Sequence, residues 1–196
     1  SPSQQDNALY TTITNSFNHL NYLIKKKQED EALSILIDIS ECHEVGLGVS
    51  KTRKGTKISK KQAQDILSLF KDIPEYSQFG FTHFEIIQLY ISGISKDRIS
   101  DITCNYLKSF LIDYTIEQCE INKIPTEGVI LDSIYNYKTN KLDTNQKVYL
   151  PVNPLTKESL IFTPKRWLRF NTWINYEDYF QKYCPRDEIF NPNEPE

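Results

Sequence analysis

The chain has 196 residues, a formal net charge of −3, and 39% hydrophobic against 25% charged residues. This balance excludes an intrinsically disordered chain and a uniformly basic protein that wraps nucleic acid. The length suits one domain, which can bury a core without disulfides or a structural metal. The four cysteines form no Cys-x-x-Cys pair, so we expect reduced thiols and a cytoplasmic protein. The lack of a long apolar run predicts no membrane span.

The N-terminal part of the chain predicts three helices. Apolar residues recur at helical spacing over 9–24, and three consecutive acids at 29–31 open a second helix. The apolar run over 33–39 also fits a strand, because it is rich in β-branched residues. Ser59 and Gln62 form a capping box, so a third helix begins there. Its predicted buried stripe consists of Ala63, Ile66, Leu67 and Phe70.

The central and C-terminal parts predict both strands and helices. Residues 84–91 are largely apolar on both faces, which predicts a strand in the centre of a sheet. The longest helix is expected over about 100–120. Short strands at 147–152 and 160–163 flank a predicted hairpin loop, and a last short helix is expected over 176–183.

Together these elements predict an α+β fold. We expect a single mixed domain over 1–184, with N-terminal helices, a small central sheet with a long helix, and a C-terminal β-hairpin. The residues after 184 are rich in proline, asparagine and glutamate, so a frayed tail is expected over 185–196.

The segment 93–105, between the predicted central strand and the long helix, is the first candidate site. Within the helix, Asp101, Asn105 and Lys108 lie on one face at i, i+4 and i+7. Asp97 shares that face if the helix extends back far enough. Hard divalent cations prefer such oxygen ligands, and Lys108 could orient or neutralise a phosphate beside them.

The same segment has a simpler interpretation. Ser100 or Asp101 could cap the long helix, since serine and aspartate are preferred at that position. Asp97 and Arg98 would then form a solvated turn.

A second acidic group lies on the predicted second helix. Asp38, Glu41 and Glu44 are spaced i, i+3 and i+6, and with Asp101 they could complete a two-carboxylate metal site. Nucleases hold Mg²⁺ in this way to polarise a phosphodiester and activate water. The alternative is a solvated helix face. Glu44, next to two glycines, is the strongest candidate of the three.

Two basic segments are candidate nucleic-acid contacts. The loop over 51–61 and the segment over 165–173 supply cations, and in the second they alternate with aromatic residues that suit base stacking. The candidates are Lys51, Arg53, Lys54, Lys57, Lys60, Lys165, Arg166 and Arg169. Lysine-rich loops are also ordinary solvated surface, and tryptophan with arginine suits a protein interface equally well. A partner protein subunit is therefore the alternative.

Three stretches carry a resemblance to known proteins. They are Glu-Val-Gly-Leu-Gly-Val-Ser at 44–50, the segment 93–105 with its Asp-Arg-Ile-Ser-Asp core, and Leu-Pro-Val-Asn-Pro at 150–154 leading to Thr-Pro-Lys-Arg-Trp-Leu at 163–168. Together they resemble uncharacterised bacterial proteins associated with phage defence and restriction-like nucleases. The resemblance covers about the middle two-thirds of the chain and implies a role in anti-phage defence.

Similarity to the PD-(D/E)XK nuclease class would give these residues roles. Asp101 would match the metal-binding aspartate of that class, and Glu44 its helical glutamate. The chain departs from the class because no Glu-x-Lys strand follows Asp101, and a predicted helix stands in its place. Lys108 or Lys165 would then have to substitute for the lysine.

The leading hypothesis is a domain that acts on nucleic acid, DNA rather than RNA, by Mg²⁺-dependent phosphodiester cleavage. Its catalytic residues would be Asp101, Glu44 and Lys108, with the metal held by Asp101, Glu44 and Asp97. One alternative is a non-catalytic adaptor that binds nucleic acid or a partner subunit in a defence complex. Another is a purely structural subunit of a larger assembly.

Overall fold

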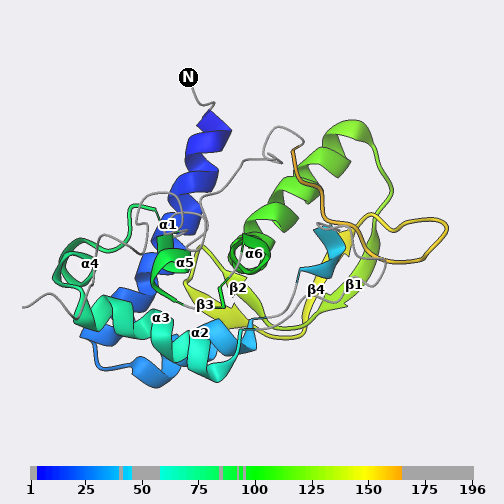
Figure 1. Cartoon of the computed structure of the whole chain (residues 1–196). Coiled ribbons are helices and arrows are strands. Elements are labelled where there is room, and N and C mark those ends of the chain that lie inside the picture. The colour runs from blue at the N-terminus through cyan, green and yellow to red at the C-terminus, as the bar shows by residue number, and fades with distance from the viewer. Residues whose placement is uncertain are drawn as a thin grey trace, which may run out of the picture.

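The computed structural model describes residues 4–39, 42–45, 58–83, 86–91, 93–94 and 96–164 of the chain. Its helices are α1 (Gln4–Lys25), α2 (Glu29–Asp38), the 3₁₀ helix η1 (His43–Val45), α3 (Lys60–Asp72), α4 (Pro74–Phe79), α5 (Ile87–Tyr90) and α6 (Lys96–Asn122). Its strands are β1 (Glu127–Leu131), β2 (Ile134–Asn136), β3 (Lys141–Asp143) and β4 (Gln146–Leu150). Helices and short antiparallel strands make the predicted α+β fold (Figure 1).

The first three long helices form where the sequence predicts them. The residues that α1 buries from its predicted apolar face include Ile13, Phe17 and Leu20. Residues 29–38 are helical, so the strand alternative is wrong for that part of the 33–39 run. The backbone N–H of Gln62 donates to Ser59 Oγ at 3.2 Å, and the Ser59 N–H donates to Gln62 Oε1 at 3.2 Å. This completes the predicted capping box, and all four residues of the predicted stripe of α3 are buried.

The strand predicted over 84–91 is wrong. Residues 87–90 form the short helix α5, and residues 84 and 85 lie outside the described part. Within this helix Ile87 and Gln88 are buried and Tyr90 is exposed, and the backbone of Ile91 directly after it is extended. A short apolar run does not by itself distinguish a buried strand from a buried helical turn.

The strands come instead from the residues after α6, which form two two-stranded sheets. β1 pairs with β4 and β2 pairs with β3, both antiparallel. Asn140, with a φ of 56°, closes the turn between β2 and β3 by donating its N–H to the Asn136 carbonyl at 2.8 Å. In Figure 1 β1 and β4 lie on one side of α6, and α1 to α5 lie on the other.

The predicted loop over 153–159 closes a hairpin whose second arm is not a strand. Val152 and Ser159 form an antiparallel bridge, and the Asn153 N–H donates to the Glu158 carbonyl at 2.9 Å. Residues 160–163, predicted as a strand, have no strand assignment. The helix predicted over 176–183 and the tail over 185–196 lie outside the described residues.

One hydrophobic core runs through the described part of the chain, from α1 to residue 161. Phe17 lies among three rings, with centroid distances of 5.8 Å to Phe70, 5.6 Å to Phe81 and 6.0 Å to Tyr106. α1, α3 and α6 therefore share one aromatic cluster, in keeping with a single domain. Among the described residues, no helix combines the length and the apolar character needed to cross a membrane.

Candidate functional site

A buried ion pair joins two of the predicted site residues. Lys108 Nζ lies 3.1 Å from Glu44 Oε2. The side chain of Lys108 is 3% exposed and that of Glu44 is 13% exposed. The Glu44 side chain is therefore the more solvent-accessible part of the ion pair. Each charge compensates the other, because either one alone would be poorly solvated there.

Contacts between three segments of the chain hold this pair in place. Glu44 lies in η1, and its carbonyl accepts the N–H of Ile161 at 3.0 Å. The next residue, Phe162, donates its N–H to Thr115 Oγ1 of α6 at 2.8 Å. The segment over 160–163 therefore ties η1 to the helix that carries Lys108. Figure 1 shows the short blue ribbon of η1 between α6 and β4.

Two half-buried thiols lie beside the pair. Cys42 precedes Glu44 by two residues, and Cys104 precedes Lys108 by about one helical turn. Burial and then the neighbouring Cys104 raise the pKa of the Cys42 thiol well above its usual range, although the Lys108 ammonium lowers it. Burial and the Asp101 carboxylate raise the pKa of Cys104 to about 12. Both sulfurs are protonated at neutral pH, so neither is an activated nucleophile.

Asp101 and Asp97 lie on the same helix as the lysine of the ion pair. α6 begins at Lys96, earlier than expected, and includes both aspartates. The alternative in which Ser100 or Asp101 caps this helix is therefore wrong, and Asp97 is helical rather than part of a turn. Asp101 is half-buried and acts electrostatically on Cys104, which places its carboxylate near the same cluster.

The acidic group predicted on the second helix is not assembled there. α2 ends at Asp38, because Ile39 has an extended backbone with a ψ of 126°. Glu41 lies outside the described residues, and Glu44 belongs to the separate η1. Asp38 accepts a hydrogen bond from the hydroxyl of Ser34, one turn earlier. Glu44 therefore meets α6, and its helical spacing to Asp38 has no structural meaning.

The Glu44 carboxylate beside Lys108 suits Mg²⁺ by its chemistry. Glu44 Oε2 is buried and accepts no aligned hydrogen bond from the described residues, its contact with Lys108 being an ion pair. Within the described ranges, no three or more His, Cys, Asp or Glu side chains gather into a metal-binding group. Mg²⁺ needs only one or two carboxylates when waters and substrate phosphates complete its octahedron. Glu44 and Asp101 are ligands of that type, and their pairing on one ion stays a prediction, as does Asp97 as a third ligand.

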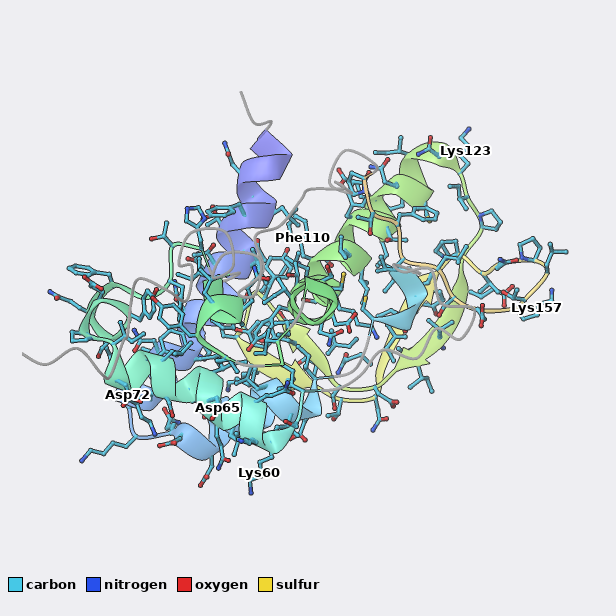
Figure 2. All side chains as sticks on the ribbon, in the orientation of Figure 1. Lys60, Asp65, Asp72, Phe110, Lys123 and Lys157 are labelled. Carbon is cyan, nitrogen blue, oxygen red and sulfur yellow. The ribbon has the colours of Figure 1, made fainter. Side chains whose placement is uncertain are left out.

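Most of the cations predicted to bind nucleic acid lie outside the described residues. These are Lys51, Arg53, Lys54, Lys57, Lys165, Arg166 and Arg169. Lys60 is exposed in the first turn of α3, and Figure 2 shows its side chain directed away from the ribbon. Lys61 beside it is exposed as well. Of the predicted basic loop, the described part thus contributes two solvent-facing lysines.

The two cysteines are the residues of this cluster that sequence analysis did not select. A signal for Cys104 was present, because it lies three residues after Asp101 and four before Lys108 and so shares their helical face. Asn105, which was predicted on that face, is buried. No local pattern links Cys42 to α6, since that contact depends on the path of the chain between α2 and η1.

Comparison with known proteins identifies a family for this chain. The model of a family described as a domain of unknown function, DUF8370, matches residues 1–175 of this chain. Neither the curated proteins nor the solved structures contain a significant match to it.

Proposed function

The chain belongs to the DUF8370 family, and from the site at Glu44 and Lys108 we propose that it cleaves nucleic acid with the help of Mg²⁺. One observation carries the proposal. Two residues that the sequence analysis selected separately, as a metal ligand and as a phosphate-neutralising cation, form an ion pair of 3.1 Å. A carboxylate can hold a metal ion for phosphodiester cleavage, and a lysine beside it can neutralise charge on the phosphate.

Glu44 and Asp101 would hold the ion, which supplies Lewis-acid activation of the phosphodiester and of a water molecule. Lys108 compensates the charge of Glu44 in the folded chain. Its ammonium group is also suited to neutralise a phosphate oxygen. Burial and the ion pair with Glu44 restrict the Lys108 side chain, so little conformational entropy is lost when it acts.

The resemblance stated above supports the wider setting of this proposal. It favours a role in bacterial anti-phage defence, and we further propose a cytoplasmic location from the reduced thiols, DNA in preference to RNA, and another protein subunit as a partner. The exposed Lys60 and Lys61 supply positive charge for contact with a nucleic-acid backbone.

A cleavage assay with the purified full chain tests the proposal. Single- and double-stranded DNA and RNA are incubated with Mg²⁺, Mn²⁺ or EDTA, and the variants are Glu44→Gln, Asp101→Asn and Lys108→Met. We expect cleavage that needs the metal and is lost in each variant, because each removes a ligand or the phosphate-neutralising charge. The matched control is Asp113→Asn, an acid on the same helix whose partner is Lys138 at 2.7 Å.

Asp113→Asn should cleave like the unmodified chain, and circular dichroism melting should show that every variant is folded. Metal-dependent cleavage that persists in folded Glu44→Gln and Asp101→Asn would contradict the proposed site. An absence of cleavage on all four substrates would contradict the proposed activity for the isolated chain.

A non-catalytic adaptor is the second candidate function. It is favoured by the same ion pair, because Lys108 already neutralises Glu44 when no phosphate is bound. In that case binding of nucleic acid would be salt-sensitive, would survive Asp101→Ala, and would weaken when the lysines over 51–61 are neutralised.

A further inference from the structure

The outer face of the β1–β4 sheet combines an aromatic ring, a cation and an aliphatic side chain. The register places Gly128 opposite Tyr149 and Ile130 opposite Lys147, so these four residues share one face. Ile130 is 71% exposed and Tyr149 is 56% exposed. The opposite face of the same strands includes Leu131 and Leu150, which are buried in the core. The exposed face is therefore not needed to complete the core.

Lys147 and Tyr149 are held as a pair on this face. Lys147 Nζ lies 5.7 Å from the centroid of the Tyr149 ring, which is a cation–π contact. The stem of Lys147 crosses Gly128, where a Cβ atom would lie 2.9 Å from Lys147 Cε. The absence of a side chain at Gly128 thus lets the lysine lie next to the ring.

Tyr149 differs from the other exposed tyrosines of the described residues. Tyr10 hydrogen bonds to the Thr82 carbonyl, and Tyr90 accepts a hydrogen bond from the Tyr76 hydroxyl at 3.0 Å. Tyr22 stacks on a histidine ring at 5.4 Å. In the part of the chain that the structure describes, no aromatic side chain stacks on Tyr149, so the ring is accessible to a planar ligand.

We propose that this face binds one nucleotide of single-stranded nucleic acid, with the base stacked on Tyr149 and the phosphate paired with Lys147. Charge complementarity selects this occupant, because the face has one cation, no acid and an exposed ring. Bases stack on such rings while cations track the phosphates, and Ile130 adds apolar contact beside the base. The inference deepens the proposed action on nucleic acid and names single strands as the class that is bound.

Fluorescence anisotropy with labelled oligothymidylate and oligouridylate tests this inference. The full chain is titrated in EDTA, so that metal-dependent cleavage does not intervene. Tyr149→Ala should weaken binding by at least about fivefold, because one stacked base is lost. Tyr149→Phe should bind like the unmodified chain, since stacking does not use the hydroxyl group. Lys147→Met should lower the slope of log affinity against log salt by about 0.7, the value for one phosphate on a single strand.

Tyr22→Ala is the matched control. Tyr22 is 52% exposed and has Lys26 Nζ 5.7 Å from its ring centroid, the same contact as at Tyr149 but on a helix. This variant should bind normally. Equal affinity of Tyr149→Ala and the unmodified chain, an equal loss in Tyr22→Ala, or no binding of either oligonucleotide would overturn the inference and leave the face to a protein partner.

The outcomes separate this inference from the proposed function. Tyr149-dependent binding without metal-dependent cleavage would support the nucleotide site and contradict the nuclease proposal. Cleavage that is lost in Glu44→Gln, together with binding that is unchanged in Tyr149→Ala, would support the nuclease proposal and contradict the nucleotide site.

Discussion

The folded chain buries the opposite charges of Glu44 and Lys108 together as an ion pair. Removing two ions from water costs several kcal/mol each, and their attraction offsets that cost only when they lie close together. At 3.1 Å the distance is suitable, and the carboxylate keeps 13% of its exposure. Such a pair contributes little net stability, although losing one partner is costly.

Lys108→Met should therefore lower the free energy of unfolding by about 3 kcal/mol, because it leaves the Glu44 carboxylate without a partner. The double variant Glu44→Gln/Lys108→Met should recover most of that loss, since no uncompensated charge remains. Urea unfolding at neutral pH measures both variants. A double variant that is no more stable than Lys108→Met would show that the loss comes from packing, not from charge.

At the scale of single elements, α3 and α5 differ in whether local sequence signals determine their helical conformation. α3 has a capping box at its start and a regular buried stripe along its length, so local signals agree with the tertiary fold. α5 has four residues and no side-chain cap. Its one isoleucine, Ile87, is buried beside Gln88, and neighbours in space decide the helical form of so short a segment.

The cap of α3 gives a direct prediction. Ser59→Ala removes the oxygen that accepts the Gln62 N–H and should lower the free energy of unfolding by about 1 kcal/mol. Ser68→Ala, in the interior of the same helix, should change stability little, because alanine is the best helix former. Equal losses in the two variants, measured by urea unfolding, would show that the cap does not stabilise α3.

At the scale of the whole molecule, several ionisable groups are placed where their charged forms are disfavoured. Burial raises the pKa of Cys104 from its ordinary value of 9.0 to about 12, and it also raises the pKa of Cys42 and Tyr106. For each group the unfolded chain releases its proton at a lower pH than the folded chain does. Between pH 9.0 and about 12 the unfolded state therefore binds fewer protons, and stability falls as pH rises.

Urea unfolding midpoints should accordingly begin to decrease as pH rises from about 8 to about 9, where most tyrosines with an ordinary pKa of about 10 stay protonated. Cys104→Ala should reduce this dependence, because one of the contributing thiols is removed. Cys119→Ser provides a comparison with a thiol at another position of α6. A slope in Cys104→Ala equal to that of the unmodified chain would show that this thiol does not contribute.

The long helices and the α+β class could be predicted from the amino-acid sequence, because helix caps and apolar spacing act between residues three or four positions apart. The same short-range spacing placed Asp101 and Lys108 on one helix face. It misassigned residues 87–90 and put Glu44 on α2, since a local pattern does not show where a helix ends in space.

The pairing of Glu44 with Lys108 and the position of Cys42 beside them could not be predicted from local sequence patterns. These contacts depend on η1 being tied through Ile161 to the chain that follows β4. The exposed face at Lys147 and Tyr149 likewise depends on the register of β1 with β4. Contacts between residues far apart in the chain are set by packing of whole elements, and no local spacing encodes them.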